Sequence, residues 1–336
     1  MADVAVLCPD TNIELAVDAP RRHAIRGGKS AIVQLAAAWA RAGHRVVLHA
    51  GRARRGAEGT FAIRSLDECE GRHDVAVWVT GALGHFRDER LRRVDARVHV
   101  FWINGPHRVE PPLHVALDWC VAPARFLARR AIDEWGLPAE RTVVIPGEAV
   151  RTRVEPSASA AREALAGVYA SHPDKGLREA LTVLARCRTQ GMDATLDAFG
   201  TPAFWSAADP PALPAWARAA GDAAEDDLAA RMRGYGFMPY FTSWLDGFST
   251  ATAEAMAAGV IVFATAHGSN AEFVRHGWNG FLVRALDGQP DLGQAEHLLA
   301  SYLRAPERFE AVRANAMREV PTWDEQAAAW ERTWAR

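Results

Sequence analysis

Lysine is scarce in this sequence, and several patterns that identify common protein classes are missing. Lys29 and Lys175 are its only lysines among 39 basic residues, so all the others are arginine. No run of roughly 18 apolar residues is present, which excludes a membrane-spanning helix. Asp3 interrupts the N-terminus at once, so we expect no signal peptide. The formal net charge of -2 gives no electrostatic reason to expect a nucleic-acid partner.

The cysteines are too few and too dispersed to cross-link the chain or to hold a metal. They are Cys8, Cys69, Cys120 and Cys187, and no two of them form a C-x-x-C pair. Zinc sites and disulfide frameworks both require cysteines at short or regular spacings. We therefore expect reduced thiols in or near the core of a cytoplasmic protein.

The chain is long enough for two domains. It has 336 residues, against roughly 100–200 for an average domain, and 49% of them are hydrophobic. Apolar strands are expected at 3–8, 45–50, 74–80 and 97–102, with helical segments between them. After a stretch at 147–164 that has the composition of a linker, the alternation restarts. Such alternation predicts an α/β protein with two doubly wound parallel sheets.

One long stretch in the second half interrupts this alternation. Residues 201–221 are rich in Pro, Ala and Trp, and we expect an irregular loop there. Further strands are expected at 194–199 and 260–264, and the last helix at 322–334.

The segment 246–283 carries the most informative motif. Asp246 is followed by a turn, Gly247-Phe248-Ser249, and then by a helix that contains Glu254. The unpaired backbone N–H groups at the start of such a helix, together with its dipole, form an anion site. Glu254 lies about two turns further on, where its carboxylate can accept two hydrogen bonds from a ribose diol.

This stretch closely resembles the family-4 glycosyltransferases of GT-B fold, a retaining group with an E-x7-E motif. Asp246 is the first acid of the motif and Glu254 the second. The resemblance continues through A-M-A-A-G to Glu272 and to N-G-F-L-V at 279–283. It implies a GT-B fold, in which two Rossmann-like domains face each other across a cleft.

The resemblance also implies domain boundaries. Residues 1–147 would form the N-terminal acceptor domain, and residues 148–319 the donor domain that binds the nucleotide-sugar. The helix at 320–336 would pack back on the N-terminal domain. The loops expected to shape the acceptor pocket are 10–26, 51–60, 81–88 and 103–114.

A second match to the family is the strand-loop-helix segment 168–177, which contains His172 and Lys175. In the family this lysine contacts the donor diphosphate, and a cation beside unpaired N–H groups at a helix start suits that role. The family usually has an arginine about five residues earlier, where this sequence has Ala170. His172 or Ser171 is expected to replace it in part.

A third match is Gly27-Gly28, which opens a helix in the first half. It resembles the family's N-terminal glycine loop, whose backbone approaches the donor phosphate. Together with Lys29 and Ser30 these glycines also match the end of a P-loop, but His23 stands where a P-loop requires glycine. We therefore interpret the P-loop match as accidental and a P-loop kinase as a less favoured class.

The family often has a histidine on a loop after a strand of the N-terminal domain. Asn104 occupies that position here, and His107 follows three residues later. The resemblance implies that either of them contacts the transferred sugar and that Asp246 lies on or near the sugar hydroxyls. The residues implied to bind the donor are Gly27, Gly28, His172, Lys175, Gly247, Phe248, Ser249, Thr250 and Glu254.

The resemblance implies a glycosyltransferase that retains the anomeric configuration, and we expect it to need no metal or other cofactor. No D-x-D at a strand end is visible for a metal site. The expected partners are a nucleotide-sugar donor and a small-molecule, glycan or lipid acceptor, with at most peripheral membrane contact. A catalytically silent nucleotide-sugar-binding protein of the same fold is the alternative, because Ala170 and Asn104 depart from the family pattern.

Overall fold

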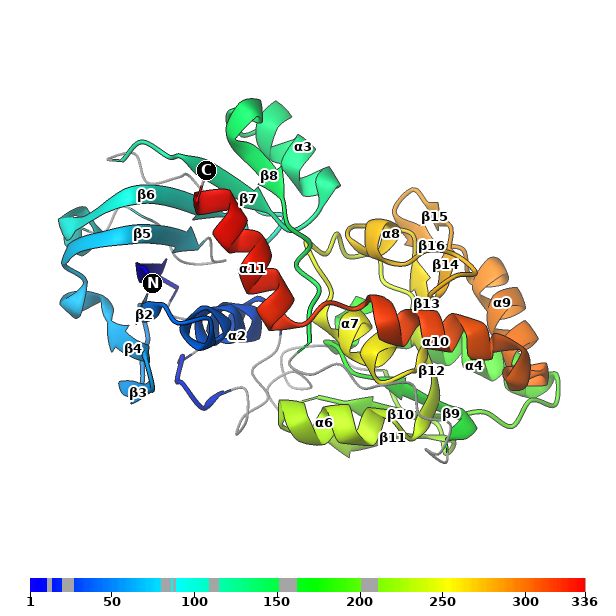
Figure 1. Ribbon diagram of the computed structural model, residues 1–336. Coiled ribbons are helices and arrows are strands. Elements are labelled where there is room, and N and C mark those ends of the chain that lie inside the picture. The colour runs from blue at the N-terminus through cyan, green and yellow to red at the C-terminus, as the bar shows by residue number, and fades with distance from the viewer. Residues whose placement is uncertain are drawn as a thin grey trace. The chain divides into compact units, whose positions relative to one another are not determined.

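The computed structural model divides the chain into two compact units. One unit holds most of the chain up to Arg151 together with Thr322–Arg336, and the other holds Thr152–Pro321. Each unit is built on its own sheet (Figure 1). His23, most of the 10–26 and 81–88 loops and much of the expected linker lie outside the described residues. Described are residues 1–10, 14–19, 27–79, 86, 89–108, 115–150, 162–200 and 211–335.

Among the described residues, the sheet of the N-terminal unit has eight strands. They are β1 (Asp3–Cys8), β2 (Arg45–Ala50), β3 (Gly56–Glu58), β4 (Phe61–Ser65), β5 (Gly71–Val79), β6 (Val94–Trp102), β7 (Trp119–Ala122) and β8 (Thr142–Val144). Their order is β3-β4-β2-β1-β5-β6-β7-β8, and all neighbours are parallel except β3 and β4. The central strands are apolar and buried, as expected for a parallel sheet covered on both faces.

The N-terminal unit includes the last helix of the chain. The helices whose bounds the structure describes in this unit are α2 (Gly28–Arg41), α3 (Arg125–Asp133) and α11 (Trp323–Trp334). α2 and α11 lie beside each other (Figure 1). Trp39 of α2 packs against Trp330 and Trp334 of α11, with ring centroids 5.6 and 5.0 Å apart. These buried aromatic contacts bind the C-terminal segment to the N-terminal unit.

The sheet of the C-terminal unit has six parallel strands. They are β9 (Glu163–Tyr169), β10 (Thr195–Phe199), β11 (Ala217–Gly221), β12 (Tyr235–Tyr240), β13 (Ile261–Thr265) and β14 (Phe281–Val283), in the order β11-β10-β9-β12-β13-β14. A small hairpin follows, formed by β15 (Ala285–Leu286) and β16 (Gln289–Pro290). The helices are α4 (Leu177–Thr189), α6 (Glu225–Met232), α7 (Thr250–Ala257), α8 (Asn270–Phe273), α9 (Leu292–Arg304) and α10 (Glu310–Glu319).

Each sheet has one point at which the order of the strands reverses. In the N-terminal unit the chain passes from β1 outward through β2, and β5 then pairs with the other side of β1. In the C-terminal unit it passes from β9 outward through β10 and β11, and β12 then pairs with the other side of β9. Open α/β sheets bind ligands outside the carboxyl ends of their strands at such switch points. The topology therefore indicates one candidate position in each unit.

The expectation of an irregular loop at 201–221 is wrong for its last five residues. Ala217–Gly221 is the edge strand β11, parallel to β10. Its sequence, ARAAG, has little intrinsic β propensity, so the pairing with β10 determines its conformation. The expected 51–60 loop likewise contains β3, which pairs with the unpredicted strand β4. A three-residue strand is too short to show a periodic pattern.

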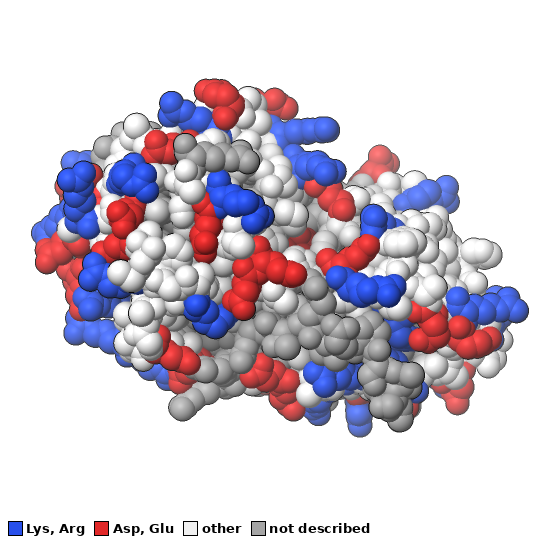
Figure 2. Space-filling model, in the orientation of Figure 1, with Lys and Arg blue, Asp and Glu red and all other residues white. Residues whose placement is uncertain are grey.

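The surface gives no sign of a polyanion-binding face in the view of Figure 2. Basic and acidic side chains are intermingled there, without an extended patch of one sign. A phosphate backbone is bound by clustered Lys and Arg side chains. In the described ranges, no helix combines the length and the apolar character needed to cross a membrane.

Candidate functional site

Lys175 lies at the switch point of the C-terminal sheet. After β9 the chain makes a single 3-10 turn, Pro173–Lys175, and α4 begins two residues later. Gly176, between the turn and the helix, has a φ of 104°. A Cβ there would lie 2.4 Å from the carbonyl oxygen of Phe241, which follows β12. Position 176 therefore requires glycine for two reasons. Its φ is unfavourable for other residues, and a side chain would prevent the close approach of the two loops.

Asp246 follows β12 and pairs with this lysine. Its Oδ1 lies 2.6 Å from Nζ of Lys175, and the Tyr240 hydroxyl donates a hydrogen bond to Oδ2 at 2.7 Å. The Asp246 side chain is 8% exposed, whereas that of Lys175 is 25% exposed, so the ammonium group has better access to water. Burial raises the pKa of Tyr240 well above its usual value, and Asp246 raises it further. The phenol therefore stays protonated and remains a donor to the carboxylate.

Trp244 completes the surroundings of Lys175, although the sequence analysis did not single it out. Nζ of Lys175 lies 5.2 Å from the centre of the Trp244 ring, and the His172 ring centroid lies 6.3 Å from that of Trp244. The residue is 47% exposed, an unusual position for a large aromatic side chain. A single loop tryptophan gives no periodic signal. Its position two residues before Asp246 was the one feature of the sequence that could have indicated that Trp244 belongs to the site.

The start of α7 is held by Ser249. Its hydroxyl accepts a hydrogen bond from Thr252 N at 3.3 Å and lies 2.8 Å from the Thr252 hydroxyl, which in turn donates to Asn270 Oδ1 at 3.1 Å. The Ser249 side chain thus caps the helix, and the Thr252 hydroxyl ties the helix to α8. Glu254, on the same helix, is half-buried.

The turn before α7 is compact, and the loop that follows a third strand, β13, contacts it. Gly247 is buried, while Phe248 and Thr250 are half-buried. After β13, Ser269 N donates to the backbone oxygen of Asp246 at 3.0 Å. A Cβ at Gly268 would lie 2.6 Å from that oxygen. Loops that follow β9, β12 and β13 therefore converge on Asp246, and sequence reasoning missed the contribution of the third loop.

In the N-terminal unit the structure brings together two of the predicted residues. Gly27 has a φ of 63°, and Gly28 begins α2. Nδ2 of Asn104, which follows β6, donates to the backbone oxygen of Gly28 at 3.4 Å. A Cβ at Gly28 would lie 2.7 Å from that nitrogen. His107 lies three residues further along the chain and is exposed.

No metal site is apparent in the part of the chain that the structure describes. Those residues contain no group of three or more His, Cys, Asp or Glu side chains placed to hold an ion. Two charged side chains of the candidate site, Lys175 and Asp246, form an ion pair, and the Tyr240 phenol donates to the carboxylate.

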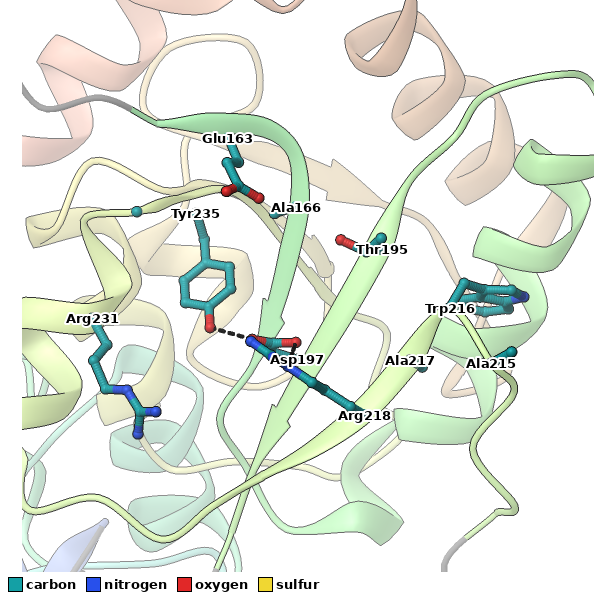
Figure 3. A pocket seen from close by; sticks show the side chains of 11 residues that line it. Glu163, Ala166, Thr195, Asp197, Ala215, Trp216, Ala217, Arg218, Arg231 and Tyr235 are labelled. Carbon is teal, nitrogen blue, oxygen red and sulfur yellow. Dashed lines mark hydrogen bonds and ion pairs between the residues drawn. The ribbon is translucent and has the colours of Figure 1, made fainter.

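A pocket of about 650 Å³ lies at the amino ends of β9, β10, β11 and β12. Figure 3 shows the side chains that line it. Tyr235, Asp197 and Arg218 come from three strands and point toward one another there. Burial raises the pKa of Asp197, but hydrogen bonds from Arg218 and Tyr235 outweigh it and hold that pKa below its usual value. The charge of the carboxylate is thus already compensated. None of the predicted site residues lines this pocket, whose edge is formed by Trp216 and Arg231.

The sequence matches a family model over this C-terminal unit. Residues 164–300 match the model described as "Glycosyl transferases group 1". That range runs from β9 into α9 and includes Lys175, Asp246 and Glu254. No protein of the curated set matches the sequence significantly.

Solved structures share the whole fold. HepE from Anabaena, in complex with UDP and glucose, is 15% identical and has a TM-score of 0.66, with 100% of both chains covered. Sucrose-phosphate synthase from Thermosynechococcus elongatus is 13% identical, with a TM-score of 0.70 and with 99% of this chain and 98% of that chain covered. AviGT4, a glycosyltransferase involved in avilamycin A biosynthesis, is 17% identical, with a TM-score of 0.68 and coverage of 100% and 98%.

These likenesses confirm the predicted fold class. The protein has two Rossmann-like parallel-sheet units of the GT-B type. The family-model match supports a glycosyltransferase.

Proposed function

We propose that this protein is a retaining, metal-independent glycosyltransferase of family 4. It would move a sugar from a nucleoside-diphosphate sugar to a small-molecule, glycan or lipid-linked acceptor. The observation that carries the proposal is the Lys175–Asp246 pair at the switch point of the sheet that matches the glycosyl transferase model. Glu254 follows Asp246 at the spacing of the E-x7-E motif. HepE, a structural neighbour, binds UDP-glucose, which supports a donor of this class.

In this reaction negative charge develops on the leaving diphosphate as the sugar's C1–O bond breaks. Lys175 and the N–H groups at the starts of α4 and α7 would stabilise that charge in place of a metal. Asp246 holds the ammonium at 2.6 Å before the donor arrives and would accept hydrogen bonds from the sugar hydroxyls. The sugar passes through an oxocarbenium-like state. Glu254 would hold the ribose diol.

The first experiment tests donor binding. UDP, GDP, ADP and dTDP are titrated calorimetrically into the parent protein, Glu254→Ala and the control Glu307→Ala, an exposed glutamate in the same unit. A hydrogen bond to a charged acceptor contributes about 1.5–3 kcal/mol, so Glu254→Ala should weaken the best nucleotide by about 10- to 150-fold. The control should bind like the parent. Equal affinities in all three proteins would remove Glu254 from the site.

The second experiment tests catalysis and the need for a metal. The parent should hydrolyse its nucleotide-sugar slowly without an acceptor, and excess EDTA should leave that rate unchanged. The sugar released first should keep the anomeric configuration of the donor, which proton NMR reports directly. A protein that binds the donor but never cleaves it would be the silent binding protein instead. Loss of hydrolysis in EDTA that Mg²⁺ or Mn²⁺ restores would contradict metal independence.

The third experiment tests whether Lys175 stabilises the charge of the donor diphosphate. Lys175→Ala should lower the hydrolysis rate more than it weakens nucleotide binding, because the phosphate charge peaks in the transition state. Arg308→Ala, which removes an exposed cation of the same unit, is the control and should leave both unchanged. A parental rate in Lys175→Ala would exclude this lysine from the reaction.

A further inference from the structure

Tyr240 is a buried tyrosine at the carboxyl end of β12, six residues before Asp246 and outside the motif at 246–283. Its backbone belongs to the sheet, so the sheet fixes the start of its side chain. Its ring lies beside that of Tyr169, the last residue of the neighbouring strand β9, with the ring centroids 6.4 Å apart. The position of the Tyr240 hydroxyl is therefore set by two strands and not by a loop.

The two carboxylate oxygens of Asp246 bind different groups. Oδ1 lies 2.6 Å from Nζ of Lys175, and Oδ2 accepts the Tyr240 hydrogen bond at 2.7 Å. A carboxylate that is held at one oxygen can still turn about its last side-chain bond, for which the preferred angles are broad. When both oxygens are held, such a turn breaks a contact. The bond from Tyr240 therefore fixes the direction in which Asp246 holds the ammonium group.

The ammonium group of Lys175 depends on this contact for its position. It is a compact charge at the end of a flexible four-carbon stem, so the stem alone does not place it. Nζ also lies 5.2 Å from the ring centre of Trp244, but that ring is an exposed side chain of a loop. The contact with Asp246 is the more restrictive of the two, because Asp246 is buried and is itself bound at the end of a strand.

The Tyr240 hydroxyl also contacts the loop that carries Lys175. A hydrogen bond with the Ser171 side chain lowers the pKa of Tyr240, although burial and Asp246 raise that pKa by more. Ser171 follows β9 and lies four residues before Lys175. One hydroxyl group thus contacts both of the loops whose side chains form the ion pair. Its removal should loosen the pair from both sides.

We propose that Tyr240 is a positioning residue for glycosyl transfer, which through Asp246 holds the ammonium group of Lys175 where negative charge develops on the leaving diphosphate. A charged group stabilises a transition state most when it is in place before the reaction, since no free energy is then spent on turning it. Tyr240 is buried, and it acts through Asp246 rather than on the substrate. The inference deepens the proposed function and rests on it for the role of Lys175.

The chemical reactivity of Lys175 tests the positioning without any turnover. Acetic anhydride acetylates lysine amines, and the chain has only Lys29 and Lys175, so peptide mass spectrometry follows both in one sample. Lys29 lies in the other unit and is the internal reference. Tyr240→Phe should raise the acetylation rate of Lys175 relative to Lys29 at least about threefold, because loss of one hydrogen bond to the carboxylate loosens the pair.

The matched control is Tyr302→Phe. Tyr302 is a buried tyrosine of the same unit, and its hydroxyl donates to the backbone oxygen of Ala164 at 3.1 Å and not to a carboxylate. This variant loses the same single oxygen and should keep the parental acetylation rates. Tyr240→Phe retains its ring beside Tyr169, and Asp246 retains its ion pair, so we expect both variants to fold. Thermal melts check that they are folded at the assay temperature.

Steady-state hydrolysis of the nucleotide-sugar then separates positioning from binding. Tyr240→Phe should lower kcat about five- to twentyfold and leave KM within about twofold, because a displaced ammonium group stabilises the transition state less. Tyr302→Phe should leave both constants unchanged. In the Lys175→Ala background, Tyr240→Phe should lower kcat by less than about twofold further, since the group that it positions is absent.

A parental kcat in Tyr240→Phe, or a parental acetylation rate of Lys175 in that variant, would overturn the proposal. So would the same loss of kcat with and without Lys175, because Tyr240 would then act by another route. Failure of the proposed function would look different. In that case the parent protein would hydrolyse no nucleotide-sugar, while the acetylation rates would still report whether Tyr240 holds the ion pair.

Discussion

Removing one partner of the Lys175–Asp246 pair should destabilise the protein unequally, depending on which partner is removed. Lys175→Met leaves a carboxylate that is 8% exposed and that keeps, among the described residues, the hydrogen bond from Tyr240 at 2.7 Å. Asp246→Asn leaves an ammonium group on a side chain that is 25% exposed and can turn to water. The asparagine still accepts the Tyr240 hydrogen bond. The first change therefore creates an uncompensated buried charge and the second does not.

The magnitudes follow from that difference. Breaking a fully buried pair costs about 3–5 kcal/mol, and the partial exposure of Lys175 reduces this to about 2–3 kcal/mol for Lys175→Met. We expect about 1 kcal/mol for Asp246→Asn, the usual net value of a hydrogen bond. The double variant has no buried charge and should cost about 1–1.5 kcal/mol. The coupling energy between the two positions is then about 1.5–3 kcal/mol.

Urea unfolding, followed by circular dichroism and by tryptophan fluorescence, measures these free energies. Two probes are needed because two units can unfold in separate transitions. The exposed pair Arg284–Asp291 serves as the matched control, and Arg284→Met should cost at most about 1 kcal/mol. The reasoning would be refuted if the two single variants lost the same free energy of unfolding and the double variant lost the sum of the two.

Three further outcomes are expected. Gly176→Ala should destabilise the protein by about 2–4 kcal/mol in thermal melts, because its φ is 104° and its Cβ would lie 2.4 Å from a carbonyl oxygen. Gly191→Ala, with φ at 86° and no atom within 4 Å of its Cβ, should cost only the backbone share, and similar losses for both would exclude the contact with Phe241. Trp244→Ala should weaken nucleotide-sugar binding about three- to tenfold, because it removes an exposed ring that can stack on the ligand and contacts Lys175; the equally exposed Trp278→Ala should not, and identical affinities in calorimetry would exclude stacking. The lowered pKa of Asp197 means that its ionised form stabilises the fold above the ordinary carboxyl pKa of about 3.9, and that this stabilisation is lost as the pH falls through the folded-state value. The melting temperature should therefore fall less between pH 6 and pH 3 in Asp197→Asn than in the parent, and parallel profiles would contradict this.

The sequence by itself determined the fold class, because that depends on patterns local to short stretches of chain. Buried runs such as Val4–Leu7 and Ile261–Ala264, separated by amphipathic helices, allow little besides parallel sheets covered on both faces. The order of glycines and acids in 246–283 was also readable, since a turn, a helix start and a strand follow one another there without a gap. The short edge strand at Ala217–Gly221 could not be predicted from the sequence, because its conformation is determined by pairing with β10 and not by its own residues.

Only the tertiary structure decided which charges meet. Lys175 and Asp246 are 71 positions apart, and they pair because β9 and β12 are neighbours in the sheet although two strands separate them in the chain. The same holds for Asn104 against Gly28, which are 76 positions apart. Lys175 and Asp246 were both visible in the sequence from the start, but their pairing was not. An ion pair depends on distance and on exclusion of water, and both are set by strand order, which no local pattern of residues records.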